Sequence, residues 1–247
     1  MRHHGRVPLT SSAVPVRPTS VPAAVLFDMD GTLVDTEPYW IAAEHELVES
    51  FGHVWTHEDA LGLVGRSLLD SAQILHEHGV DLEPVEIVDR LVARVGDALS
   101  RRVPWQAGAR ELLETLRAAG VPCALVTMSY TALAQRLVDA CSPGTFAAVV
   151  TGDEVSRGKP DPEPYLEAAR RLGADVTRCV AVEDSRPGIT SALASGARTI
   201  GVPSVVPVPP RDGLSRVASL EQVDLDVLAA VVAGDDVDLT STAVSLV

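Results

Sequence analysis

Short apolar runs alternate with longer amphipathic segments along most of the chain, and this alternation predicts the secondary structure. The first run, Ala23 to Phe27, has the length and aliphatic content of a buried strand and ends at a group of acidic residues. Runs of the same kind predict four more strands, at 122–127, 146–151, 179–182 and 198–202. The segments between these runs are polar enough to lie on the outside of a sheet.

Helical spacing marks the segments that follow the strands. Leu112, Leu113 and Leu116 share one helical face, which predicts a helix over 109–119 that ends at Gly120. The same reasoning predicts helices at 131–140, 162–172 and 187–195. Because strands and helices alternate, we predict an α/β fold whose core is a Rossmann-like parallel sheet covered on both faces.

Residues 38–105 interrupt this alternation. They contain helical patterns at 39–51, 67–78 and 84–99 and no convincing strand. An all-helical segment inserted directly after the first strand predicts a small cap domain over the carboxyl edge of the sheet. That edge is where open α/β folds bind their ligands.

The two ends of the chain show no hydrophobic period. The first 20 residues contain three prolines and several Ser and Thr, which is typical of a disordered segment. We therefore predict a disordered lead at 1–20, a core formed by 21–37 and 106–234, a helical cap at 38–105 and a loose tail at 235–247.

Composition restricts the partners and the compartment. The net charge of −14 disfavours general binding to nucleic acid or to acidic membranes, although a locally positive pocket can still bind an anion. No apolar run reaches the ~18 residues needed to span a bilayer, and the start of the chain lacks the continuous apolar segment of a secretory signal. Three cysteines without a CxxC pair suit a reducing compartment. We expect a cytoplasmic protein.

The acidic residues after the first strand are the first candidates for chemistry. Asp28 and Asp30 stand at i and i+2 on a turning backbone that continues into Gly31. One carboxylate can attack an electrophile while the other transfers a proton, and a divalent cation can offset their repulsion. Taken alone, the pair is equally well interpreted as a structural turn.

The longer string Asp-Met-Asp-Gly-Thr-Leu-Val-Asp-Thr-Glu at 28–37 resembles the first motif of the haloacid dehalogenase (HAD) superfamily, whose members are mostly phosphatases. The family's second motif is a Ser or Thr at a strand end, which Thr127 matches. The resemblance implies that the Thr127 hydroxyl and the neighbouring backbone N–H groups, at Met128, bind phosphate oxygens.

Two further motifs of the family are present in order. The third is a lysine, matched by Lys159, which is the only lysine among the 20 Lys and Arg of the chain. The fourth is an acidic pair after a strand, matched by Glu183 and Asp184. The resemblance implies a Mg²⁺ site made from Asp28, Asp30 (through its main-chain carbonyl), Glu183 and Asp184, a ligand set rich in oxygen.

The mechanism that the resemblance implies has two steps. Asp28 attacks phosphorus and forms an aspartyl-phosphate while Asp30 protonates the leaving oxygen, and Asp30 then activates the water that hydrolyses the intermediate. Lys159 and Mg²⁺ neutralise charge on the phosphoryl oxygens.

The predicted cap is similar to that of the subgroup that contains β-phosphoglucomutases and sugar-phosphate phosphatases. The string Leu-Val-Gly-Arg-Ser at 63–67 resembles the substrate-binding cap loop of the mutase, so Arg66 is a candidate to contact the substrate, with a plain surface arginine as the alternative. The mutase has a histidine twelve residues after its nucleophile and a lysine in its cap. This chain has Trp40 at that position and no cap lysine, which favours hydrolysis over phosphoryl-transfer isomerisation.

We expect the partner to be a small phosphorylated metabolite, with a sugar phosphate favoured by the string Asp-Thr-Glu-Pro-Tyr-Trp at 35–40. No obligate protein partner is implied. A β-phosphoglucomutase-type isomerase and a non-catalytic binding protein of the same fold are the alternatives. The second of these conflicts with the presence of Asp28, Asp30, Lys159 and Asp184 together.

Overall fold

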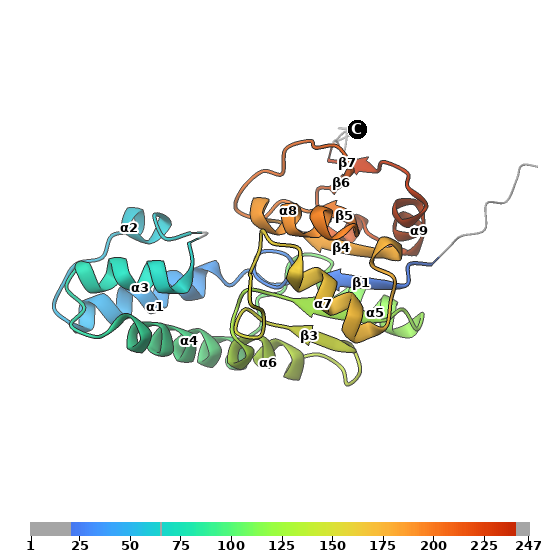
Figure 1. Ribbon diagram of the computed structural model, residues 1–247. Coiled ribbons are helices and arrows are strands. Elements are labelled where there is room, and N and C mark those ends of the chain that lie inside the picture. The colour runs from blue at the N-terminus through green and yellow to red at the C-terminus, as the bar shows by residue number, and fades with distance from the viewer. Residues whose placement is uncertain (1–20, 65, 241–247) are drawn as a thin grey trace, which may run out of the picture.

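A seven-stranded parallel sheet forms the centre of the computed structural model, which describes residues 21–64 and 66–240 (Figure 1). The strand order is β3-β2-β1-β4-β5-β6-β7, and each neighbouring pair is parallel. The strands are β1 (Ala24–Phe27), β2 (Cys123–Val126), β3 (Ala148–Val150), β4 (Cys179–Glu183), β5 (Arg198–Gly201), β6 (Leu214–Val217) and β7 (Asp238–Leu239). The predicted α/β fold is confirmed. The lead predicted at 1–20 lies outside the described residues.

Helices connect the strands and cover the sheet. They are α1 (Glu37–Ser50), α2 (His57–Leu61), α3 (Leu68–Glu77), α4 (Pro84–Arg101), α5 (Ala109–Ala118), α6 (Thr131–Asp139), α7 (Glu163–Leu172), α8 (Arg186–Ser195) and α9 (Leu225–Ala233), with short 3₁₀ turns at Val176–Arg178 and Leu220–Gln222. Among the described residues, none of these helices has both the length and the apolar character required to cross a bilayer.

Both faces of the sheet are buried, as the continuous apolar strands predict. Successive side chains of a strand point to opposite faces, and in β1 the four side chains are fully buried. Ala24 and Leu26 belong to the cluster that includes residues of α7, whereas Val25 and Phe27 belong to the larger cluster on the other face. Each face is therefore closed by its own layer of helices.

The cap follows β1 directly. Figure 1 shows α1 to α4 as a helical lobe beside the sheet, and α5, which completes the β1–β2 connection, packs against β2. Helix α4 also packs on α6, so the lobe rests on the core along the side of one core helix. The predicted helical cap is confirmed, and the boundaries 38–105 remain a prediction.

The hydropathy pattern does not predict several of the observed helices and strands. Helix α2 has only five residues, too few to show a period, although Thr56 caps it with a reciprocal Thr56–Asp59 capping box. Strand β6 reads Leu-Ser-Arg-Val and has no apolar run. Strand β7 lies within the tail predicted to be loose from residue 235, and that prediction is wrong for Asp238 and Leu239, which pair with β6. Edge pairing of this kind depends on main-chain hydrogen bonds and leaves little trace in side-chain type.

A buried acid in the cap predicts a pH-dependent stability. Glu44, in α1, is only 6% exposed, and its burial, with a smaller contribution from the charge of Glu37, raises its pKa to about 7. In the unfolded chain this carboxyl ionises near its ordinary pKa of 4.5. The contribution of Glu44 to stability is therefore greatest below pH 4.5, and about 3 kcal/mol of it is lost as the pH rises to 7.

Glu44→Gln should remove that part of the pH dependence, because an amide stays neutral throughout. We expect urea unfolding between pH 4.5 and pH 8 to show a smaller loss of unfolding free energy in the variant than in the parent. Glu49→Gln, at an exposed position of the same helix, is the matched control and should behave like the parent. Parallel pH profiles for the Glu44 variant and the parent would contradict the assignment.

Candidate active site

The carboxyl ends of three neighbouring strands bring the predicted site residues together. Strand β1 lies between β2 and β4 in the sheet. Asp28 follows the last residue of β1, Thr127 follows the last residue of β2, and Glu183 is the last residue of β4. Because parallel strands end at one edge, residues separated by more than 150 positions along the chain meet there.

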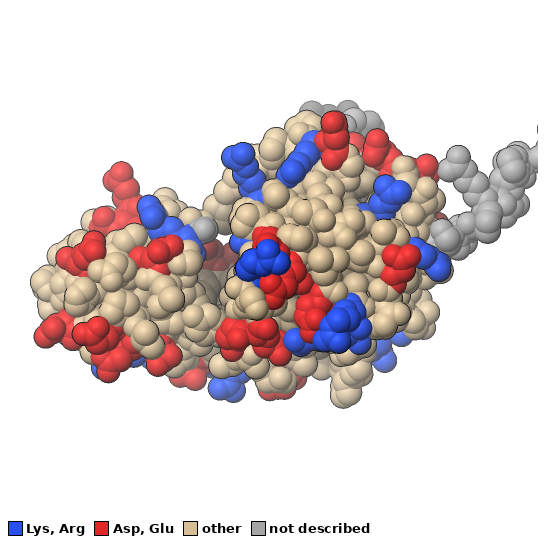
Figure 2. Space-filling model, in the orientation of Figure 1, with Lys and Arg blue, Asp and Glu red and all other residues tan. Residues whose placement is uncertain are grey.

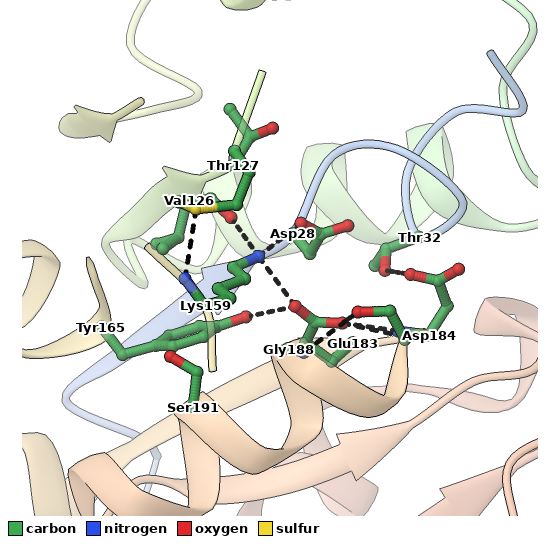
Figure 3. A network of polar contacts seen from close by, with 12 residues as sticks. Asp28, Thr32, Val126, Thr127, Lys159, Tyr165, Glu183, Asp184, Gly188 and Ser191 are labelled. Carbon is green, nitrogen blue, oxygen red and sulfur yellow. Dashed lines mark hydrogen bonds and ion pairs between the residues drawn. The ribbon is translucent and has the colours of Figure 1, made fainter. Parts of the chain in front are cut away.

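Lys159 lies at the centre of this edge, with each of its three N–H bonds used (Figure 3). Its Nζ donates to Asp28 Oδ1 (2.5 Å), to Glu183 Oε1 (2.7 Å) and to the main-chain oxygen of Val126 (2.8 Å). The Lys159 side chain is only 4% exposed. A buried ammonium with three acceptors is rigidly placed. Through these contacts Lys159 connects the ends of β1, β2 and β4.

Burial and neighbouring charges together set the pKa values of Asp28 and Lys159. Burial raises the pKa of Asp28 well above its usual value, against the lowering effect of Lys159, and the nearby Glu183 and Asp184 raise it further. Burial opposes the charge on Lys159, but Asp28 and Glu183 together hold its pKa above the usual value. The site therefore contains more carboxylates than its single lysine can balance, which is the condition that favours binding of a cation.

Glu183 is fully buried and its carboxylate accepts from many donors. Oε1 accepts from Lys159 and from the hydroxyl of Tyr165 (2.9 Å). Oε2 accepts from the backbone N–H groups of Asp184 and Ser185 and from the Ser185 hydroxyl, each at 3.0 Å. Ser185 is also the N-cap of α8, so the Glu183 carboxylate links the start of that helix to Lys159.

Tyr165 is a site residue that the sequence analysis missed. It is fully buried in α7, its ring lies 5.2 Å from Lys159 Nζ, and its hydroxyl reaches Glu183. The one feature of the sequence that could have indicated Tyr165 is its position six residues after Lys159, in the first turn of the helix that follows the loop containing Lys159. A tyrosine in a helix is usually core, so that signal was too weak to use.

Asp30 is held by three hydroxyl groups. Thr36 Oγ1 donates to its Oδ1 (2.6 Å), and Ser129 Oγ (2.8 Å) and Thr127 Oγ1 (3.3 Å) donate to its Oδ2. The hydroxyl of Thr127, predicted as a phosphate ligand, thus contacts Asp30 in this structure. Ser129 was not predicted, although its spacing of two residues from Thr127 at a strand end could have suggested it.

Asp184, the second residue of the acidic pair at the end of β4, has different contacts from Glu183. Asp184 Oδ1 accepts from Thr32 Oγ1 (3.0 Å), and burial, together with the charge of Glu183, raises its pKa to about 7. Carboxylate oxygens of Asp28, Glu183 and Asp184 lie within 4.8 Å of one another, so this cluster could bind a metal ion. Within the described part of the chain, no hydrogen bond is made to Asp28 Oδ2 or Asp184 Oδ2, and these hard oxygen donors suit Mg²⁺.

The two remaining predicted residues have different placements. Met128 Sδ accepts from the backbone N–H of Lys159 (3.2 Å), so Met128 lies against the lysine loop. Arg66 is exposed, its Nε donates to the main-chain oxygen of Gly62 (2.8 Å), and it does not line the main cavity formed by the described residues. The structure brings Met128 to the site and does not bring Arg66 to it.

A cavity of about 970 Å³ opens above this edge, between core and cap. Asp30 and Asp184 line its floor, and Glu37 and Trp40 of α1 line the cap side. Figure 2 shows the hollow between the two lobes, with acidic and basic side chains scattered over both lobes rather than gathered into a basic patch. The cavity has the size of a small-molecule site.

Comparison with known proteins agrees with this geometry. The chain matches the family model described as haloacid dehalogenase-like hydrolase over residues 25–202. It is 33% identical over 182 residues to the "Phosphorylated carbohydrates phosphatase" of Thermotoga maritima, and the match covers 72% of this chain and 83% of that protein.

Two further similarities concern a longer protein and a solved structure. The chain is 32% identical over 188 residues to the "Bifunctional riboflavin kinase/FMN phosphatase" of Arabidopsis thaliana, a match over 74% of this chain and only about half (49%) of that protein. The crystal structure of CbbY from Rhodobacter sphaeroides in complex with phosphate superposes with a TM-score of 0.73 at 26% identity, covering 81% of this chain and 96% of the other.

Proposed function

The chain belongs to the haloacid dehalogenase-like hydrolases as a phosphatase of that type, and from this premise we propose that it is a Mg²⁺-dependent enzyme that hydrolyses a sugar phosphate through Asp28. The observation that carries the proposal is the buried contact between Asp28 and Lys159 beside Asp184. A carboxylate with one oxygen held by an ammonium and the other without a hydrogen bond from the described residues is a positioned nucleophile.

In the first step, Asp28 Oδ2 attacks phosphorus and the bond from phosphorus to the leaving oxygen breaks. Asp30 donates a proton to that oxygen, so the leaving group departs as an alcohol and an aspartyl-phosphate remains. In the second step, Asp30 takes a proton from water as that water attacks phosphorus, which releases inorganic phosphate and restores Asp28. Asp30 must exchange the hydroxyls of Thr36, Thr127 and Ser129 for these groups during the cycle.

Lys159 stabilises the charge that moves onto the phosphoryl oxygens, since its ammonium is fixed on the attacking carboxylate through Asp28 Oδ1. Asp184 Oδ2 and the main-chain oxygen of Asp30 would hold Mg²⁺, together with the carboxylate oxygen of Asp28 that does not attack phosphorus. When bound, Mg²⁺ offsets the repulsion between these carboxylates and the phosphate. Because the oxygens of Glu183 already accept from five donors, Glu183 serves in this proposal to position Lys159.

The substrate class rests on two supports. The Thermotoga maritima relative is named for phosphorylated carbohydrates, and the cavity between cap and core accommodates a small metabolite. Hydrolysis is favoured over isomerisation because Trp40, and no histidine, lines the cavity at the position where the mutase has the residue that delays attack by water.

Metal removal provides the test of this function. Phosphate release from a panel of hexose, hexitol and pentose phosphates should require Mg²⁺, fall to background in EDTA and return when Mg²⁺ is added in excess. Conversion of β-glucose 1-phosphate to the 6-phosphate without phosphate release would instead support the mutase. Phosphate release that is indifferent to EDTA would contradict the proposed metal site.

A further inference from the structure

One wall of the cavity is formed by an extended segment, 203–213, which joins β5 to β6 and which we call the strap. Its residues 204–211 line the cavity, as do Trp40 and Val64 of the cap. The floor beneath contains Asp30 and Asp184. The strap is therefore part of the cavity that also contains Asp30, the proposed proton donor to the leaving group.

The strap is built to hold its shape. Val208 at its centre is 8% exposed and packs with Ile189 and Leu214, and its main-chain oxygen accepts from Arg216 Nη1 (3.1 Å). Arg211 Nη1 donates to Thr190 Oγ1 (2.9 Å), which ties the far end to α8. Four of the eleven strap residues are proline, at 203, 207, 209 and 210, so little conformational entropy remains to be lost on binding.

Two valines of this rigid segment are exposed. Val205 is 59% exposed and Val206 is 62% exposed, and both line the cavity. A contiguous apolar surface inside a cavity is typical of a ligand-binding site. Pro207 and Pro209 extend the same apolar wall, and Trp40 supplies an aromatic ring from the cap side.

We propose that the strap and Trp40 bind an aromatic ring carried by the leaving group, so that the preferred substrates are sugar or sugar-alcohol phosphates that bear such a ring. This inference rests on the proposed phosphatase function and specifies its substrate class. A bare sugar presents hydroxyl groups, and valine and proline side chains offer those groups no hydrogen bonds. A flat ring, by contrast, removes the two valines from water and packs against indole.

Matched pairs of substrates test the proposal, since the two members of each pair release the same kind of primary alcohol. The pairs are riboflavin 5′-phosphate with ribitol 5-phosphate, and adenosine 5′-phosphate with ribose 5-phosphate. We expect kcat/KM to be about 10- to 100-fold higher for the ring-bearing member of at least one pair, the range expected for burying a ring in an apolar pocket. Equal values within both pairs would overturn the proposal.

The double variant Val205→Ser/Val206→Ser separates recognition of the ring from other effects of the strap. Both side chains are exposed, so the variant should fold, and the preference for the ring-bearing member should fall about tenfold. Val85→Ser is the matched control, because Val85 is 63% exposed on α4 and does not line the cavity; it should leave the preference unchanged. An equal loss on both members of a pair would assign the valines to cap closure and overturn the proposal.

Failure of the phosphatase function itself is distinguishable from failure of this inference. If neither member of any pair releases phosphate, and Asp28→Asn is indistinguishable from the parent, the proposed function is wrong. If ribose 5-phosphate and ribitol 5-phosphate are hydrolysed in a Mg²⁺-dependent reaction as fast as their ring-bearing partners, only the ring site is wrong.

Discussion

Asp28→Asn is expected to lower the turnover of every phosphate ester that the protein hydrolyses by on the order of 10⁴-fold or more. An amide oxygen is a poor nucleophile, and the uncharged side chain no longer forms an ion pair with Lys159. The same substitution removes one of several mutually repelling carboxylates, since Glu183 and Asp184 both raise the pKa of Asp28. Folding should therefore be retained, with a thermal midpoint close to that of the parent.

Steady-state phosphate release measures the loss, and acid quenching followed by mass analysis detects the intermediate. The parent should carry a phosphoryl group on the peptide that contains Asp28, and the variant should carry none. Asp153→Asn is the control at the same edge of the sheet, because Asp153 accepts from Thr131 and lies outside the cavity lining. Its activity should match that of the parent. An active Asp28→Asn protein would show that another residue attacks phosphorus.

The resemblance to the family assigned the motif residues, and the apolar runs before three of them predicted where those three lie in the sheet. Asp28, Thr127 and Glu183 each stand at the end of an apolar run, and parallel pairing of those runs is enough to bring them together. The strands missed by the sequence analysis, β6 and β7, have four and two residues and little apolar character. Their pairing follows from the path of the chain around the sheet and not from their own composition.

The contacts within the site were less accessible to sequence reasoning. The resemblance implied that Glu183 and Asp184 both bind Mg²⁺. In the structure Glu183 is enclosed by Lys159, Tyr165 and Ser185, while Asp184 lines the cavity. Adjacent residues at the end of a strand point to opposite sides, so the two carboxylates have different surroundings. Which of them met the lysine depended on the path of the lysine loop.

Gly188→Ala is expected to have the second large effect, because it acts on the residue that positions Lys159. A Cβ atom on Gly188 would lie 1.6 Å from Glu183 Oε1 and 2.2 Å from Oε2, so the carboxylate would have to move. That carboxylate is fully buried and bonded to Lys159 and Tyr165, and a shift would leave these groups unpaired. We expect kcat to fall by about 10²- to 10³-fold and unfolding free energy to fall by about 2–4 kcal/mol.

A helical glycine elsewhere in the chain separates this steric effect from a general response to alanine. Gly96 lies within α4, and a Cβ atom there would meet its nearest neighbours, side-chain atoms of Arg136 and Leu133, at 3.9 Å. Gly96→Ala should therefore keep full activity and gain up to ~1 kcal/mol from the better helix former. Urea unfolding and phosphate release on both variants make the comparison. If Gly188→Ala matched Gly96→Ala in both measurements, Glu183 would not be fixed by α8, and the placement of Lys159 would need another cause.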